Sequence, residues 1–443
     1  MTSRASRGLF AVFLASAACA VSCGEETEPA REESETAAQP APDTPLETDV
    51  APALEAELIE QLGAIGYLAG TEPAGAPTGV VAHDPERVEP GLNLFTSGHG
   101  PVALLMDMEG EVLHEWRAEF DQVFPQHPGR ERAMEPHRNF WRDAVLFPNG
   151  DILVIWELFG LFKLDRDSRV LWAVAEHAHH DLQITEAGEI AHLQSKRRMI
   201  PGIPEKPAIE DYIVVRDDGG RELRRLAMSD ALRNANWLGM RRTFWARALD
   251  RGYGLKGKGL FDPFHTNSLR LLSALEAARL GDPFRAGDAL VSFAMLDTIA
   301  LLDMERGTAR WWQQGPFGMQ HQPQPTPDGG IILFNNFLTA ERSSVVTLDP
   351  KTGRVIREYT GPEAEPLYSR RSGRVQVLPS GNVLIVETDG GRALEITPAG
   401  DLVWQYQSPY RAGVNGELVA NLYSLYRVDA PQTRWLKGEP PSR

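Results

Sequence analysis

Three histidines precede apolar, strand-like segments at similar distances and are the first candidates for chemistry. His180 stands in "HAHHDLQITEAGEI", His265 in "DPFHTNSLRLL" and His321 in "GMQHQPQPTPDGG". Each lies roughly 6 to 9 residues before a strand or its turn. An imidazole can act as a nucleophile, transfer a proton near neutral pH or bind a metal ion. Each histidine alone could be a structural side chain that bonds a loop carbonyl, but three in register indicate one shared site.

The segments around these histidines belong to a repeated pattern. An apolar strand follows a Pro-x-Gly turn in "LFPNGDILVIW", "PTPDGGIILFNN" and "VLPSGNVLIVET", and "ITEAGEIAHL" is a looser copy. A second strand then runs through a glycine turn toward a Trp or its substitute, as in "LLDMERGTARWW" and "EITPAGDLVWQY". Short strands joined by tight turns predict antiparallel meanders, and repetition at roughly 40 to 60 residues predicts a β-propeller.

We therefore predict an all-β fold, a six-bladed β-propeller over residues 79–430. In a propeller, the loops that enter the innermost strands converge on the central channel, so the three histidines would meet there. The segment "ELVANLYSLYRV" would pair with the first unit and close the ring. Residues 229–259 break the pattern and predict a helical insertion. The predicted units are residues 92–117, 140–176, 178–228, 263–313, 319–360 and 372–408.

The N-terminal segment is typical of an export signal. Basic residues precede the apolar run "GLFAVFLASAACAVS", which stops at Cys23. Residues 1–22 therefore predict a signal peptide and resemble a bacterial lipoprotein signal in which Cys23 becomes lipidated. This interpretation places the protein in the bacterial periplasm or at the outer membrane, held by a lipid anchor. A plain secretory signal cleaved nearby is the alternative, and it also exports the protein.

Two further segments separate the signal from the predicted propeller. Residues 23–51 form an acidic, Pro-rich stretch that predicts a disordered linker. Residues 52–70 have apolar side chains at helical spacing, which predicts one amphipathic helix over Pro52–Leu68 that packs on the propeller.

Composition excludes several classes of function. The formal charge of -16 argues against nucleic-acid binding, which needs a basic face. Cys19 lies in the predicted signal, so the mature domain has no internal disulfide and no cysteine-based metal site. No later stretch has the roughly 20 apolar residues of a membrane-spanning helix, so we expect membrane contact through the lipid anchor only. The sequence contains no Gly-rich phosphate loop and no nucleotide fingerprint.

Most of the chain, from about Gly79 to Pro409, resembles the arylsulfate sulfotransferases, a family of exported bacterial six-bladed propellers. The resemblance rests on "GLNLFTSGHGPVALLMDMEGEVLHEW", on the short motifs "HHD", "FHTN" and "QH", and on "LPSGNVLIVETDGGRALEITPAGDLVWQY". It implies transfer of a sulfuryl group from a small aryl sulfate to a phenolic acceptor through a sulfohistidine. It also implies that no cofactor is needed, because the donor brings the activated group.

The resemblance implies roles for individual residues. His321, after a Gln and before a turn, matches the family's nucleophile. His265 and Asn267 match a His-x-Asn motif and would donate hydrogen bonds to the sulfonate. His180 matches a further pocket histidine, which would protonate the leaving phenolate or deprotonate the acceptor.

Two positions depart from the family pattern. Ala294 stands where the family carries an Arg that would bind the sulfonate, and Gln322 stands where Asp is common after the Gln-His pair. A missing bidentate arginine weakens transition-state binding. Arg371 and Arg374, with Arg370, precede the strand of the last predicted unit and are the candidate substitutes for substrate binding.

Two other functions stay open. A propeller lipoprotein that binds a ligand without catalysis would explain Ala294. A metal-dependent hydrolase would use the three histidines and a water as a zinc centre, although Asp181 and Asp262 are the only carboxylates that could support it. Further histidines in neighbouring segments are His137, His177 and His179.

Overall fold

The computed structural model describes residues 69–135, 138–201, 207–250, 262–339 and 341–438. The predicted signal peptide, acidic linker and amphipathic helix Pro52–Leu68 lie outside these residues, as does His137. Within the described ranges, no helix has the length and apolar character that crossing a membrane requires.

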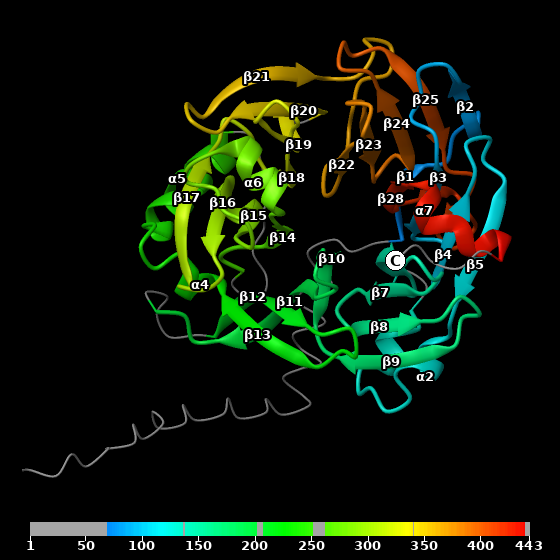
Figure 1. Ribbon diagram of the computed structural model, residues 1–443, viewed down its shortest axis with the longest axis horizontal. Coiled ribbons are helices and arrows are strands. Elements are labelled where there is room, and N and C mark those ends of the chain that lie inside the picture. Colours follow the sequence, from blue (N-terminus) through cyan, green and yellow to red (C-terminus); the bar gives the residue numbers. More distant parts are fainter. Residues whose placement is uncertain (1–68, 136–137, 202–206, 251–261, 340, 439–443) are drawn as a thin grey trace, which may run out of the picture. The chain divides into compact units, whose positions relative to one another are not determined.

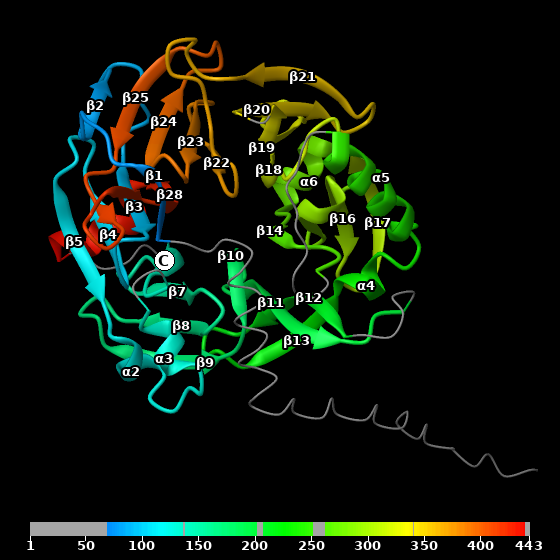
Figure 2. The same ribbon diagram turned by 180° about the vertical axis from the view of Figure 1, so that it is seen from behind.

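Six antiparallel sheets of four or five strands form the body of the described chain and surround a common centre (Figures 1 and 2). The first contains β28 (Leu422–Val428), β3 (Leu92–Ser97), β4 (Val102–Met106) and β5 (Val112–Arg117). The second contains β6 (Trp141–Leu146), β7 (Ile152–Trp156), β8 (Gly160–Leu164) and β9 (Val170–Ala175). The third contains β10 (Ala178–Ile184), β11 (Ile190–Arg198), β12 (Ala208–Arg216) and β13 (Glu222–Ala227).

The other three sheets follow the same order. The fourth contains β14 (Thr266–Leu271), β15 (Ala289–Phe293), β16 (Thr298–Asp303) and β17 (Thr308–Gln314). The fifth contains β18 (His321–Pro325), β19 (Ile331–Thr339), β20 (Arg342–Asp349) and β21 (Arg354–Tyr359). The sixth contains β22 (Arg374–Val377), β23 (Val383–Glu387), β24 (Arg392–Ile396), β25 (Leu402–Gln407) and β2 (Gly79–His83). The predicted all-β propeller is confirmed, and each sheet corresponds to one predicted unit.

One edge strand of each sheet faces the centre. β6, β10, β14, β18, β22 and β28 each contact the next one around the ring. The ring joins the two ends of the propeller because β28 pairs with β3, with Leu425 opposite Phe95. This pairing of the C-terminal strand with the first unit was predicted. The fifth strand of the last sheet, β2, was not, and neither was the small sheet of β1 (Gly70–Pro73), β27 (Leu418–Ala420) and β26 (Arg411–Ala412).

Tight turns and interlocked tryptophans explain why the sequence folds this way. The turn glycines Gly150 and Gly329 have φ angles of 90° and 84°, a region that other residues rarely adopt. Trp116 on β5 donates from Nε1 to the Gly150 carbonyl of the next sheet, 3.0 Å away. Trp404 on β25 donates in the same way to the Met108 carbonyl of the first sheet. These fully buried indoles therefore join neighbouring sheets, and truncating either should cost about 3–5 kcal/mol.

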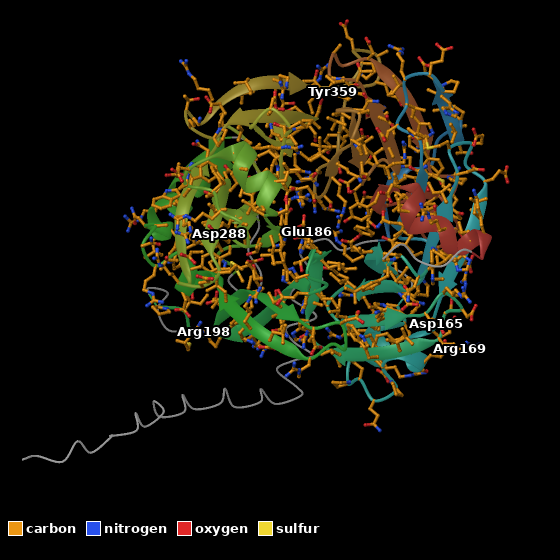
Figure 3. All side chains as sticks on the ribbon, viewed as in Figure 1. Asp165, Arg169, Glu186, Arg198, Asp288 and Tyr359 are labelled. Atoms are coloured by element: carbon orange, nitrogen blue, oxygen red, sulfur yellow. The ribbon has the colours of Figure 1, made fainter. Side chains whose placement is uncertain are left out.

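Helices lie in the connections between strands and after the last strand. The described helices are α2 (Phe120–Val123), α3 (Arg130–Ala133), α4 (Met228–Ala231), α5 (Trp237–Asp250), α6 (Ala274–Leu280), α7 (Ala430–Thr433), η1 (Ala294–Leu296) and η2 (Arg434–Lys437). α4 and α5 confirm the predicted helical insertion as far as Asp250. α5 packs against η1, the short turn that contains Ala294. Side chains fill the space that the ribbons leave open at the centre, while Asp165 and Arg169 lie at the rim (Figure 3).

Candidate active site

Three of the inner strands carry a polar residue at the same distance before a turn glycine. Arg142, His180 and His321 each lie eight positions before a turn glycine, at Gly150, Gly188 and Gly329 respectively. The next position in these strands is Asp143, Asp181 or Gln322. We give each set a name. The histidine layer consists of Arg142, His180, His265 and His321. The carboxylate layer consists of Asp143, Asp181, Gln322 and Arg374.

Irregular pairing turns the histidine layer toward the centre. The register of the inner strand shifts against its neighbour at the start of β6, β10, β14 and β18. His180 and His265 have φ angles of 57° and 46°, which are uncommon for residues other than glycine. A β-bulge re-aims the side chain that it inserts, and this explains how residues on different strands reach one site.

The structure brings the three predicted histidines together. The ring centre of His180 lies 5.1 Å from that of His265 and 6.4 Å from that of His321. His180 and His321 are each 3% exposed, and the side chain of His265 is 12% exposed. Among the described residues, no group of three or more His, Cys, Asp or Glu side chains has an arrangement that could hold a metal ion.

The hydrogen bonds of His321 fix its tautomer. Asn336 donates from Nδ2 to the carbonyls of Ser369 and Ser372, both at 2.8 Å, so its Oδ1 must face His321. His321 Nδ1 lies 2.8 Å from this Oδ1 and 3.0 Å from the Met319 carbonyl. Both neighbours are acceptors, so Nδ1 carries the proton and Nε2 carries the lone pair. Nε2 is buried and has no hydrogen-bond partner in the described structure.

Burial keeps His321 neutral. Burial lowers the pKa of His321 to about 3, and the positive charges of Arg142 and His265 act in the same direction. The hydrogen bond that His321 donates to Asn336 acts to raise the pKa but is outweighed by burial. A neutral imidazole with an unpartnered Nε2 has the form that a nucleophile requires.

His265 has the opposite electrostatic character. Its Nδ1 lies 2.6 Å from Asp262 Oδ2, and its backbone N–H donates to Asp262 Oδ1 at 2.8 Å. Burial acts to lower the pKa of His265, but Asp262, together with Asp211 and Glu157, more than offsets this effect, and the pKa is raised overall. The pair can therefore hold a proton beside His180, whose own pKa burial lowers well below the usual value.

A second histidine supports His180 from behind. His179 Nδ1 lies 2.8 Å from His180 Nδ1, so the two rings share a proton. His179 Nε2 lies 3.4 Å from Asp211 Oδ1. Asp211 also accepts hydrogen bonds from Ser195 Oγ and from the Thr266 N–H at the start of β14. His179 was a minor candidate in the sequence, and the structure makes it the neighbour that orients His180.

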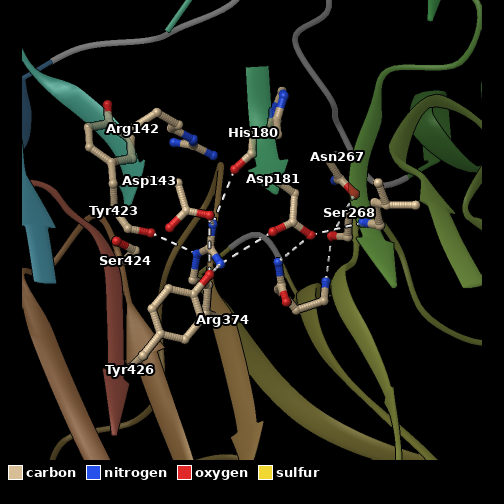
Figure 4. A network of polar contacts seen from close by, with 12 residues as sticks. Arg142, Asp143, His180, Asp181, Asn267, Ser268, Arg374, Tyr423, Ser424 and Tyr426 are labelled. Atoms are coloured by element: carbon tan, nitrogen blue, oxygen red, sulfur yellow. Dashed lines mark hydrogen bonds and ion pairs between the residues drawn. The ribbon is translucent and has the colours of Figure 1, made fainter. Parts of the chain in front are cut away.

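The carboxylate layer is organised around Arg374 (Figure 4). Arg374 Nη2 donates to Asp143 Oδ2 at 2.7 Å and to the His180 carbonyl at 3.1 Å, and Nη1 lies 3.5 Å from Asp181 Oδ1. Nη1 also bonds the hydroxyl of Tyr426. Burial raises the pKa of Asp143 to about 6, against the pull of Arg374. Arg374 therefore lies among the inner strands, and two carboxylates already balance its charge.

The remaining predicted residues take positions that the sequence did not reveal. Asn267 donates from Nδ2 to the Gln320 carbonyl at 2.8 Å, so it holds the loop that carries His321. Gln322 donates to Asp181 Oδ2 at 2.8 Å, where an aspartate would meet another carboxylate. Arg371 is exposed and lines a separate cavity of about 360 Å³ with Tyr368, Arg370 and Asp389 among others. Ala294 is fully buried, and its N–H donates to the His265 carbonyl.

Sequence reasoning missed three polar residues of this site. Arg142 is the second residue of β6 and is 4% exposed, and its Nε lies 3.5 Å from Glu157 Oε2. Glu157 follows β7 and also accepts from the His180 N–H at 3.4 Å. Asn336 lies within β19. The shared distance to the turn glycine could have identified Arg142, whereas Glu157 and Asn336 carry no such signal.

Comparisons with solved structures find similarity at low sequence identity. Three similar solved structures are a protein of unknown function from Bacteroides caccae, a streptogramin B lyase and the WD40 β-propeller domain of Doa1. The first is 13% identical with a TM-score of 0.49, covering 76% of this chain and 98% of that one. The lyase is 12% identical with a TM-score of 0.41, and the Doa1 domain is 14% identical with a TM-score of 0.42. Each match covers 82% of this chain and 96% of the other. No curated protein matches the sequence.

A family model provides the assignment. The model described as "Arylsulfotransferase (ASST)" matches residues 143–409, more than half of the 443-residue chain. The matched residues include His180, His265 and His321, whereas Arg142 lies immediately before them. The chain belongs to the arylsulfotransferase family.

Proposed function

We propose that the protein transfers a sulfuryl group from an aryl sulfate to a phenol, and that His321 carries the group between the two half-reactions. The observation that carries this proposal is the unpartnered Nε2 of His321, which holds a lone pair because Asn336 and the Met319 carbonyl fix the proton on Nδ1. The family membership supports an arylsulfotransferase-type activity in general.

In the first half-reaction, the Nε2 lone pair forms a bond to the sulfur of the donor. The bond between sulfur and the aryl oxygen breaks, and the phenolate leaves with its electron pair. A protonated His265 gives its proton to this phenolate and keeps the hydrogen bond to Asp262. The enzyme then holds a sulfo-imidazole and a neutral His265.

The second half-reaction reverses these steps with the acceptor. His265 takes the proton of the incoming phenol, the phenol oxygen attacks the sulfur, and the bond between sulfur and Nε2 breaks. The lone pair returns to Nε2 and the proton stays on His265, so no cofactor or external base enters the balance. The raised pKa of His265 and the lowered pKa of His180 favour His265 as the proton carrier. The sequence had suggested His180 for this role.

His180 and Asn267 act as supports in this proposal. His180 is neutral and shares a proton with His179, so it can donate a hydrogen bond without transferring a proton. Asn267 fixes the Gln320 carbonyl next to the nucleophile. We expect both to hold the geometry of the site.

The test is transfer from 4-nitrophenyl sulfate to a phenol by the purified full chain, with and without a chelator. Parallel lines in double-reciprocal plots and unchanged rates with chelator are expected, because a covalent enzyme intermediate gives ping-pong kinetics. His321→Ala should abolish transfer. The control His127→Ala removes a buried histidine packed among Phe rings and should lower stability while transfer continues. A wild type that binds phenols without turnover would favour the non-catalytic binding propeller, and activity lost to chelator would favour the metal hydrolase.

We further propose that the protein is exported as a lipoprotein, from the apolar run that ends at Cys23. Cys23→Ser should move the protein from the membrane fraction to the soluble fraction. A variant that stays with membranes would contradict lipidation at this residue.

A further inference from the structure

A sulfuryl transferase needs positive charge aimed at the three sulfonate oxygens, whose negative charge must be stabilised in the transition state. The cations predicted for this task do not meet the need. Arg374 is paired with Asp143 and Asp181, and Arg371 lines the separate cavity. Ala294 leaves no charge at the family's position.

Arg142 is the buried cation of the histidine layer. Its Nη2 donates to Ser372 Oγ at 3.1 Å, and its guanidinium carbon lies 4.4 Å from the ring centre of Tyr423. Glu157 is its partner, at 3.5 Å from Nε, which is a loose contact for an ion pair. These contacts hold the guanidinium in place and leave part of its donor capacity unused.

The buried polar atoms of this region that have no hydrogen-bond partner in the described structure include Nε of Arg142, Oε1 of Glu157 and Nε2 of His321. A buried donor or acceptor without a partner is costly, so native proteins seldom keep several together unless a ligand satisfies them.

Arg142 is also connected to the nucleophile. Ser372 accepts from Arg142 through its hydroxyl and from Asn336 through its carbonyl, and Asn336 orients His321. The positive charge of Arg142 acts to lower the pKa of both His180 and His321, so the three side chains interact electrostatically.

We propose that Arg142 binds the sulfonate oxygens of the donor. It takes over the role of the family's arginine, whose position Ala294 occupies in this chain, and it does so from a different strand. This inference rests on the proposed sulfuryl transfer. Arg142 is then a catalytic residue that contacts the substrate, and Glu157 is the counter-ion that holds the guanidinium in the free enzyme. Arg142 lies the same number of positions before its turn glycine as His180 and His321 do. We therefore expect its side chain to face the same part of the channel.

The test compares wild type, Arg142→Lys and Arg142→Gln in the full chain. We expect Arg142→Gln to lower kcat/KM for 4-nitrophenyl sulfate by about 10²–10³-fold and Arg142→Lys by a smaller factor. Competitive inhibition by inorganic sulfate should weaken at least tenfold in Arg142→Gln. Because Arg142 also lowers the pKa of His321, the acid limb of the rate profile should move to higher pH in this variant. A purely structural arginine would not change sulfate affinity.

The matched control is Arg216→Gln, which removes another buried arginine, one that pairs with Glu176 in the third sheet. It should lower the unfolding temperature and leave sulfate inhibition unchanged. An Arg142→Gln variant with wild-type kcat/KM and sulfate inhibition would overturn the inference.

Failure of the two proposals can be told apart. If wild type transfers no sulfuryl group, the proposed function fails, and sulfate binding measured by titration calorimetry still tests Arg142. Weaker sulfate binding by Arg142→Gln than by wild type would support an anion site at Arg142. Equal binding by the two proteins would overturn it.

Discussion

Replacing Asp262 with asparagine isolates the part that proton transfer plays in the proposed mechanism. Asp262 Oδ2 lies 2.6 Å from Nδ1 of His265 and is the carboxylate that raises the pKa of this histidine against burial. In Asp262→Asn the amide can still accept the His265 N–H through Oδ1, so the turn before β14 should persist. The facing group becomes a neutral donor, which no longer stabilises the imidazolium.

The expected loss of rate can be worked out by comparison with another buried histidine of this protein. His177, for which burial is also the main influence, has its pKa lowered to about 4. If His265 of the variant resembles His177, roughly one molecule in a thousand carries the proton at pH 7. The rate that needs this proton should then fall by about 10²–10³-fold.

The assay compares two donors that differ in the leaving group. Phenyl sulfate releases a basic phenolate and needs the proton, whereas 4-nitrophenyl sulfate releases a stabilised anion and needs it little. Asp262→Asn should therefore lower kcat/KM by about 10²-fold or more for phenyl sulfate and by less than about tenfold for 4-nitrophenyl sulfate. Equal losses for both donors in a folded variant would refute the assignment of His265 as the proton carrier.

Four other predictions follow from the same contacts. Asn336→Ala removes one of the two acceptors of His321 Nδ1–H and the Asn336 donor to the Ser369 and Ser372 carbonyls, of which Ser369 keeps a bond from Ser343 Oγ, so transfer should slow at least tenfold and stability should fall by about 2–4 kcal/mol in urea unfolding. Arg374→Met leaves two buried carboxylates without a cation and should cost about 3–5 kcal/mol in the same measurement. Ala294→Arg should destabilise the fold without raising activity, because Ala294 is fully buried beneath α5; a more active variant would contradict this. With phenyl sulfate, kcat/KM should fall as pH rises through the raised pKa of His265, but should not fall between about pH 7 and pH 5, because the nucleophile stays neutral down to its pKa of about 3.

The sequence was sufficient to predict the propeller because the pattern that specifies it is local. Pro-x-Gly turns or looser copies of them, alternating apolar strands and a terminal Trp or its substitute recur along the chain, and these features determine strands and hairpins over short stretches. The closing strand was recognisable for the same reason. β2 was missed because "GVVAH" is too short to distinguish an added outer strand from a loop.

The candidate site was only partly predictable because its residues meet through long-range packing. His180, His265 and His321 share a position relative to their strands, which a sequence can display. Asp262 lies three residues before His265, and the sequence offered it only as a carboxylate of a possible metal centre. The partners Glu157 and Asn336 act through contacts between strands, and their roles depend on burial. The sequence offered Arg374 as a sulfonate ligand because no local pattern reveals that Asp143 and Asp181 pair with it.

The most direct measurement of the central claim is detection of the sulfo-enzyme. The purified chain would be mixed with an aryl sulfate donor without acceptor, quenched in alkali because the adduct is acid-labile, digested and analysed by mass spectrometry. The account predicts one sulfuryl group on the peptide that contains His321, lost on addition of a phenol and absent from His321→Ala. Transfer activity without such an adduct, or an adduct that persists in His321→Ala, would contradict the account.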